Sequence, residues 1–213
     1  MASIEKMLKE LREKGRPLAS FKKGDVIHVN NKMQQGYSYT LSEEPGTNLG
    51  FKPYATPGEM LAAGVFEGKY MNDCIDEYPS EWFMNALALG KLSPGKADPS
   101  VNAFGIKSRQ NLDVWQENCW VPSSKCKGEK KKSSRNEILS DPTKNPDERG
   151  WFQFYCRYWM GRRIPELDKI QIARWNSFVR HAGQIKKNCK PGDLECYKKS
   201  RQGLLQWAHN AFI

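Results

Sequence analysis

The stretch from Gly150 to Arg163 constrains the fold more than any other part of the chain, because most of its side chains are aromatic, apolar or cationic. On a helix its rings form two stripes on different sides, and both stripes need to be covered. The pattern predicts a buried central helix over residues 147–160. Arg157 lies within it, and an unpaired buried charge costs about 3–5 kcal/mol. We expect an anionic or carbonyl partner beside Arg157, and the candidate carboxylates are Asp73, Asp76 and Glu77.

Turn residues and caps divide the rest of the chain into further elements. Two short apolar stretches near the amino end flank turn residues, which predicts a β-hairpin. Thr56 to Glu59 reads as a capping box, with a capping hydroxyl, a proline at the first helical position and a reciprocating carboxylate. The other predicted helices cover residues 3–14, 57–64, 80–90, 165–188 and 197–211, and the predicted strands cover residues 25–29 and 37–41.

These elements predict an α+β protein that is mainly α-helical, with a small N-terminal β-hairpin and a C-terminal helical bundle. Residues 1–120 form the mixed α+β part, and residues 150–213 form the helical part. Between them, residues 121–149 are rich in lysine and almost free of large apolar side chains. This segment is interpreted as a mobile basic loop or linker. We expect the two flanking parts to pack together as one domain.

Positive charge is concentrated in the second half of the chain. The formal net charge is +10, but residues 1–100 carry 12 Lys and Arg against 13 Asp and Glu, while residues 101–213 carry 22 against 11. Clustered cations bind polyanions because neutralised phosphates release condensed counterions. We therefore expect a nucleic-acid partner, with DNA as the first candidate; a solvated basic face that serves only solubility is the alternative. The expected phosphate-contacting residues are Lys130, Lys131, Lys132, Arg162, Arg163, Arg180, Lys187, Lys198, Lys199 and Arg201.

Phosphate contacts carry no base sequence, so weak sequence specificity is expected. Two other classes of function remain open. One is an enzyme that acts on nucleic acid or nucleotides through acids that could bind Mg²⁺ or serve as general acid and base, although these acids could equally form a solvated face. The other is a virion or assembly component whose basic surface meets an acidic protein. The acidic cluster of the enzyme alternative comprises Glu67, Tyr70, Asp73, Asp76 and Glu77.

Four of the six cysteines form two pairs of equal spacing: Cys119 with Cys126, and Cys189 with Cys196. Four thiolates could hold a tetrahedral zinc, but structural zinc pairs are usually separated by about two to four residues. A disulfide within each pair would require an oxidising compartment. The first predicted helix is charged from its second turn, unlike the apolar core of a signal peptide. We therefore expect an intracellular protein, in the host cell if it is viral, with free thiols, no cofactor and no membrane association.

Several stretches carry a resemblance to a known family: Gly150 to Arg163, Gln171 to Trp175, Arg180 with His181, Leu204 to Ala208, Gly64 to Tyr70, and Glu81 to Phe83. Together they resemble an uncharacterised protein family of phages, algae and fungi. The resemblance covers residues 50–211, with the basic segment as an insertion. It implies a widespread intracellular or virus-encoded role and a nucleic-acid context, without a mechanism that can be transferred.

Overall fold

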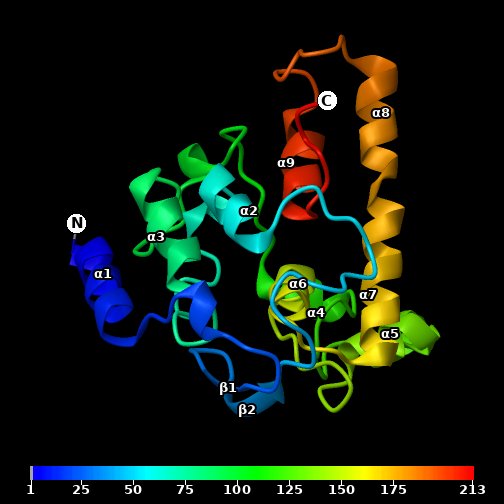
Figure 1. The fold of residues 1–213 in the computed structure, drawn as a ribbon. Coiled ribbons are helices and arrows are strands. Elements are labelled where there is room, and N and C mark those ends of the chain that lie inside the picture. The colour runs from blue at the N-terminus through cyan, green and yellow to red at the C-terminus, as the bar shows by residue number, and fades with distance from the viewer. Residues whose placement is uncertain (1) are drawn as a thin grey trace.

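A computed structural model describes residues 2–213 and places α6 (Trp151–Met160) at the centre of the fold (Figure 1). All ten residues of α6 are buried, as the two aromatic stripes predicted. Trp151 stacks on Trp207 with 4.7 Å between ring centroids, and Phe152 packs against Phe66 at 5.1 Å. Since these partners come from distant parts of the sequence, α6 is the element on which the other segments assemble.

The remaining elements confirm the predicted α+β, mainly helical fold. Strands β1 (Val26–Asn30) and β2 (Gln35–Thr40) pair antiparallel as the expected hairpin. The other helices are α1 (Ala2–Lys14), α2 (Pro57–Ala63), α3 (Ser80–Ala88), α4 (Leu112–Glu117), α5 (Ser134–Ser140), α7 (Pro165–Phe178), α8 (Arg180–Asn188) and α9 (Lys198–Gln206). Short 3-10 turns are η1 (Leu18–Ser20), η2 (Phe66–Gly68), η3 (Pro99–Val101) and η4 (Gly128–Lys132). None of the helices described is both long and apolar enough to cross a membrane.

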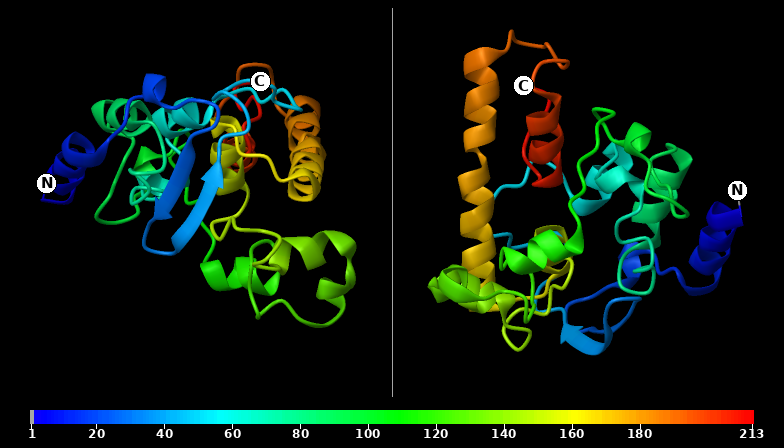
Figure 2. Two further views of the ribbon diagram at one scale, coloured as in Figure 1. Left: turned by 60° about the horizontal axis from the view of Figure 1, so that its bottom comes forward. Right: turned by 180° about the vertical axis from the view of Figure 1, so that it is seen from behind.

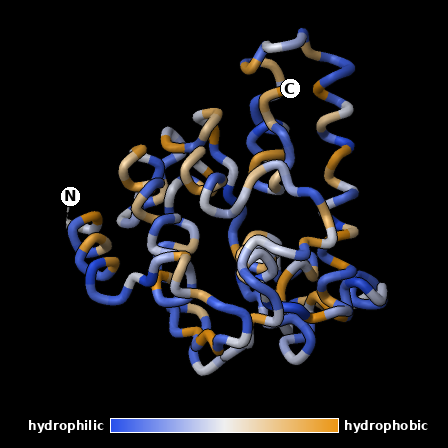
Figure 3. The backbone as a smooth tube through the Cα atoms, in the orientation of Figure 1, coloured by the Kyte–Doolittle hydropathy of each residue, from blue (hydrophilic) through white to orange (hydrophobic). Residues whose placement is uncertain are grey.

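The predicted helix over residues 165–188 is divided into α7 and α8 at Val179. There the Val179 amide donates to the carbonyl of Asn176, three residues back, so the helical hydrogen bonding tightens locally. The two helices still follow one another as a single rod, and α9 lies beside α8 (Figures 1 and 2). Hydrophobic and hydrophilic residues alternate along this rod, as expected of helices with one face on the protein (Figure 3).

The capping box was predicted correctly. The Thr56 hydroxyl accepts from the Glu59 amide at 3.2 Å, and the Glu59 carboxylate accepts from the Thr56 amide at 2.7 Å. Because Pro57 has no N–H, three amides at the start of α2 lack a helical partner, and this exchange satisfies two of them.

The basic segment over residues 121–149 is more ordered than its composition suggested. It contains η4 and α5, and Ser133 caps α5 by accepting from the Asn136 amide at 3.2 Å. Leu139 is fully buried, and so are the polar side chains of Asn145 and Asp147. The polarity of residues 145–149 therefore reflects internal hydrogen bonding rather than exposure to water.

Arg157 is the centre of a buried ionic network. Its Nε donates to the Glu77 carboxylate at 2.5 Å, and its Nη1 donates to Asp147 at 3.0 Å. Carbonyl oxygens of Pro146 and of the Gln34 side chain accept from the same guanidinium at 2.9 and 2.7 Å. Glu77 was among the expected partners, whereas Asp147 lay in the segment interpreted as a loop. The guanidinium is thus fully hydrogen-bonded although its side chain has no exposed surface.

Arg162 completes this network. It was predicted to be an exposed phosphate contact, but it is buried. Its two terminal nitrogens donate to the two oxygens of Asp147 at 2.6 and 2.7 Å, and its side chain is 2% exposed. Burial alone would raise the pKa of Asp147, but Arg162 and Arg157 outweigh burial and hold that pKa below its ordinary value. The prediction was wrong because a helix-end arginine looks the same in sequence whether it faces water or a buried carboxylate.

Two other predicted phosphate contacts are held by backbone carbonyls. Arg201 is buried and donates to the carbonyls of Cys196, Ala211 and Ile213, each at 2.8 Å, and to that of Asp193 at 2.9 Å. Arg201 therefore joins the C-terminal end to the turn before α9, and its guanidinium is not available to a ligand. Arg163, which is half-buried, donates to four carbonyls and lies 3.9 Å from the ring centroid of Tyr158.

The four paired cysteines form two disulfides, so the expectation of free thiols was wrong. Cys119 is bonded to Cys126 and Cys189 to Cys196, with Cα atoms 5.0 and 5.8 Å apart. In each pair the intervening residues fold back between two helical elements, which brings the Cα atoms within disulfide reach. This pairing also removes all four as thiolate ligands of the zinc alternative. The remaining cysteines, Cys74 and Cys156, are free and buried.

Replacement of Arg162 tests the buried network. We expect Arg162→Gln to lower the free energy of unfolding by about 3 kcal/mol, because it leaves a buried carboxylate with an incomplete set of partners. Urea denaturation followed by circular dichroism measures the change. Lys187→Gln, which removes an exposed charge from α8, is the control and should stay within about 0.5 kcal/mol of the parent protein. Equal stability of the two variants would show that the network does not hold the fold.

Thiol counting tests the disulfides. Unfolded in guanidinium without reductant, the protein should expose two reactive thiols, those of Cys74 and Cys156, and reduction should raise the count to all six cysteines of the chain. Reduction should also lower the melting temperature, because each short closed loop contributes roughly 2–3 kcal/mol. A count of six before reduction would contradict the pairing.

Candidate functional site

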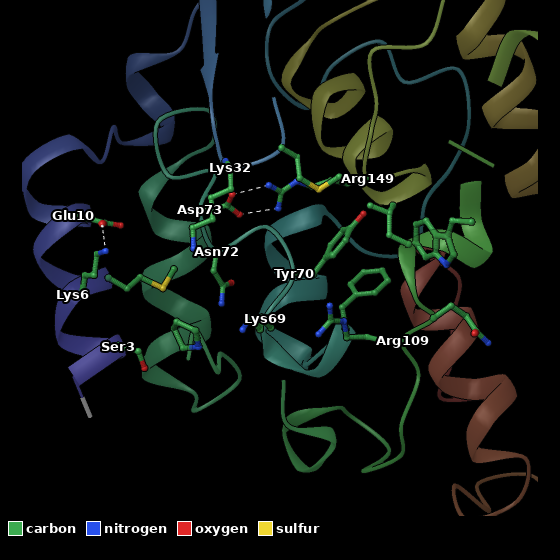
Figure 4. Close-up of a pocket in the computed structure, with 17 residues that line it drawn as sticks. Ser3, Lys6, Glu10, Lys32, Lys69, Tyr70, Asn72, Asp73, Arg109 and Arg149 are labelled. Atoms are coloured by element: carbon green, nitrogen blue, oxygen red, sulfur yellow. Dashed lines mark hydrogen bonds and ion pairs between the residues drawn. The ribbon is translucent and has the colours of Figure 1, made fainter. Parts of the chain in front are cut away.

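A pocket of about 520 Å³ lies between α1, the hairpin turn, η2 with the residues that follow it, and the start of α4 (Figure 4). It combines positive charge with aromatic rings, which is the combination expected of a site for an aromatic anion. The cations are Lys6, Lys32, Lys69, Arg109 and Arg149, the carboxylates are Glu10 and Asp73, and the rings are Phe66, Tyr70 and Trp115.

The pocket is built on a strained turn. Phe66, Glu67 and Gly68 have positive φ angles of 52°, 57° and 66°, and Met71 has a φ of 66°. For a residue other than glycine this left-handed conformation costs roughly 1–2 kcal/mol. Such strain persists only where surrounding contacts enforce it, and it is concentrated at functional sites.

Glu67 holds much of this turn in its left-handed conformation through hydrogen bonds. Its amide donates to the side-chain oxygen of Asn102 at 2.8 Å, and its carboxylate accepts from the amides of Ser108 at 3.1 Å and Arg109 at 3.3 Å. Glu67 is only 4% exposed. It therefore fixes the backbone of Arg109 beside the turn that carries Lys69.

Asp73 ties three segments together at the upper wall of the pocket (Figure 4). Its carboxylate accepts from the terminal nitrogens of Arg149 at 2.8 and 2.7 Å, and from the Lys32 amide at 2.9 Å. Burial alone raises the pKa of Asp73, but these donors outweigh burial and lower it below its ordinary value. Asp73 is thus an ionised structural anchor between the hairpin turn, the pocket segment and the start of α6.

The predicted acidic cluster is dispersed by the fold. Glu67 braces the turn, Asp73 binds Arg149, and Glu77 belongs to the Arg157 network. Asp76 lines a smaller, adjoining pocket, so Tyr70 and Asp73 are the members of the cluster that reach the main one. Within residues 2–213, no three His, Cys, Asp or Glu side chains are arranged to hold a metal ion. The geometry therefore offers no support for Mg²⁺ chemistry by these acids.

Three cations of the pocket have no carboxylate partner. Lys6 lies 3.9 Å from Glu10, and Arg149 is bound to Asp73, so these charges are offset. The exposed side chains of Lys32, Lys69 and Arg109 form no ion pair anywhere in the part of the chain that the structure covers. The Lys69 ammonium does donate to the Gly95 carbonyl at 2.8 Å. The rim of the pocket is consequently electropositive.

The rings of the pocket are anchored in the core. Phe66 packs against Tyr70 at 4.7 Å and against Phe152 of α6 at 5.1 Å between ring centroids. Trp115 lies over Gly150, where a Cβ atom would be 2.6 Å from the indole. The glycine before α6 therefore permits the close approach of the Trp115 ring, and these rings have little freedom to move.

Three polar atoms in the pocket wall lack hydrogen-bond partners among residues 2–213: the Tyr70 hydroxyl, the side-chain oxygen of Asn72 and the Nε of Arg149. Burial raises the pKa of Tyr70 well above its ordinary value and outweighs the charge of Arg149, which lowers that pKa. Unpaired buried polar atoms are uncommon in folded proteins, and they occur where a ligand or an ordered water completes the hydrogen bonding.

Sequence reasoning selected the segment from Glu67 to Glu77 for its acids and included Tyr70, but it missed the cations and the other two rings around it. Lys69 could have been identified from the sequence, since it lies inside that segment. Arg109 and Trp115 carry no local signal that separates them from ordinary surface and core residues, and only the folded chain brings them to η2.

The remaining predicted phosphate contacts do not form one surface. Lys130, Lys131 and Lys132 are exposed on η4, next to α5, which contacts α7. Lys187 and Lys199 are exposed near the junction of α8 and α9, at the other end of the rod (Figure 1). Arg180 is exposed at the start of α8, and Lys198 is partly exposed and forms an ion pair with Glu195.

No family model, curated protein or solved structure that was compared with this chain matches it. The assignment of a function therefore depends on the physical properties of the pocket.

Two glycines test whether η2 is held as tightly as its contacts indicate. Gly68 and Gly105 have similar φ angles of 66° and 63°, so alanine is strained at both. A Cβ on Gly68 would lie 2.7 Å from the Ser93 amide nitrogen, whereas one on Gly105 meets nothing within 4 Å. We expect Gly68→Ala to cost about 1–3 kcal/mol more than Gly105→Ala in urea denaturation. Equal costs would mean that the turn adjusts freely.

Proposed function

We propose that the protein binds single-stranded nucleic acid and that the pocket is the centre of the binding site. One observation carries this proposal: Lys32, Lys69 and Arg109, which have no carboxylate partners among residues 2–213, surround a pocket lined by aromatic rings. Cations that follow the sugar–phosphate backbone and rings on which bases stack are the two features that sequence-tolerant single-strand binders share. Weak sequence specificity follows, because neither feature reads a base edge.

The pocket supports this function better than the C-terminal helices do. Of the ten cations that were predicted to contact phosphates, Arg162 and Arg201 are buried, and Arg163 is held by carbonyls and a ring. The others are divided between η4, the α7–α8 junction at Arg180 and the junction of α8 and α9. A duplex surface needs a continuous row of cations, whereas a single strand can place individual phosphates and bases in a pocket.

Fluorescence anisotropy with a labelled 12-nucleotide oligo-dT tests the proposal. With three phosphate contacts, log affinity should fall against log salt with a slope of roughly −2. The triple variant Lys32→Gln, Lys69→Gln and Arg109→Gln should lose most of that slope and bind at least about tenfold more weakly at low salt. Unpaired bases reach the rings, so a duplex of the same length should bind less tightly than the single strand.

The control removes the same charge elsewhere. In it, Lys130, Lys131 and Lys132 of η4 are all replaced by Gln, and its affinity and salt slope should match those of the parent protein. If this control loses binding while the pocket variant retains it, the basic segment is the site and the proposal is wrong. Equal affinity for heparin and oligo-dT would likewise contradict it, because heparin has charge but no bases.

A further inference from the structure

We infer that the pocket holds one nucleotide unit, with the base against the ring of Trp115 or Tyr70 and the 5′-phosphate between Lys69 and Arg109. This inference rests on the proposed function and names the group that occupies the site. A single nucleotide combines a flat aromatic base with a phosphate, and the pocket offers a matching surface for each.

The size of the pocket fits one such unit. Its volume of about 520 Å³ is within the range of roughly 300–1,000 Å³ typical of sites for small molecules. A base is an apolar disc with polar edges, and the wall provides both rings and the unpartnered polar atoms of Tyr70 and Asn72. A folded duplex could not place a base there without unpairing it, which favours an unpaired nucleotide.

The phosphate subsite follows from the hydrogen bonds of Glu67. Because its carboxylate binds the amide of Arg109, the backbone of Arg109 is held beside the turn that contains Glu67, and Lys69 follows Glu67 by two residues. Both side chains are exposed and lack carboxylate partners in the region that the structure describes. Neighbouring cations of this kind bind a phosphate by charge-assisted hydrogen bonds.

The ring subsite is carried best by Trp115. Gly150 lies close to the six-membered ring of its indole, and the ring lines the pocket while remaining half-exposed. Stacking of a base on an aromatic side chain is worth roughly tenfold in affinity per base. Trp120, in contrast, is 39% exposed and lies outside the pocket.

Isothermal titration of the intact protein with 5′-AMP, adenosine and inorganic phosphate tests the inference. We expect 5′-AMP to bind more tightly than either part alone and to displace the labelled oligo-dT. Arg109→Gln should weaken 5′-AMP binding about tenfold, as should Trp115→Leu, whereas adenosine binding should respond to the tryptophan change alone.

Matched control variants show whether a loss of 5′-AMP binding comes from the pocket or from a general loss of charge or of an aromatic ring. Lys107→Gln removes an exposed charge two residues before Arg109 that does not line the pocket, and Trp120→Leu removes an indole outside it. Both should bind 5′-AMP like the parent protein. Circular dichroism must show the same melting temperature for Arg109→Gln and Lys107→Gln, and Arg109→Lys, which keeps the charge, should recover part of the affinity even if Trp115→Leu fails to fold.

The outcomes distinguish this inference from the proposed function. If oligo-dT binds but 5′-AMP neither binds nor competes, the single-nucleotide site is wrong and single-strand binding stands. If 5′-AMP binds in the pocket but oligo-dT does not, the site takes a free nucleotide and single-strand binding is wrong. Failure of both ligands overturns both, and so does unchanged binding by Arg109→Gln together with Trp115→Leu.

Discussion

The buried pairing of arginines with carboxylates is the interaction on which the rest of the structure depends. Arg157 and Arg162 share Asp147, Arg157 also binds Glu77, and Arg149 binds Asp73. Removing such charges from water costs several kcal/mol per ion, and it is offset here because nearly every donor meets an acceptor in good geometry. The network links the β-hairpin, the residues after η2, the segment before α6 and α6 itself. A partial set of these partners would leave an uncompensated buried charge, so the four segments assemble together.

The same network places the pocket. Asp73 and Glu77 lie four residues apart, so the segment that anchors Arg157 also anchors the pocket wall at Arg149. On the other side, Phe152 of α6 supports the ring of Phe66. The strained turn at η2 is therefore held between an ionic anchor and an aromatic one, and these add to the hydrogen bonds of Glu67 in enforcing its positive φ angles. A rigid turn suits a binding site, because side chains that are already in place lose less entropy when a ligand binds.

Local sequence patterns predicted the helices and strands well. They did not predict which charged side chains are exposed and which are buried in ion pairs. Apolar periodicity on two sides of α6, turn residues in the hairpin and the capping box at Thr56 each depend on neighbours in sequence, and each was correct. Whether Arg162 faces water or Asp147 depends on tertiary packing, which the sequence pattern does not record. Disulfide formation likewise required knowing how each loop folds back. For the pocket, sequence identified the segment from Glu67 to Glu77 but assigned it acid chemistry, because Arg109 and Trp115 reach it only through the fold.

The uneven charge of the chain consequently has a different meaning from the one its sequence suggested. The amino-terminal half supplies Asp73 and Glu77, and the carboxyl-terminal half supplies Arg149 and Arg157. Part of the asymmetry thus reflects ion pairs that join the two halves, and those arginines are not available to a polyanion. Arginine suits this role since its guanidinium has five donors and is less strongly hydrated than an ammonium. The rim of the pocket instead carries mainly lysines, which keep their hydration. The charge that an anionic ligand meets is therefore determined by which cations the fold leaves unpaired. Within the residues that the structure describes, Lys32, Lys69 and Arg109 form no ion pair and lie around a pocket lined by aromatic rings.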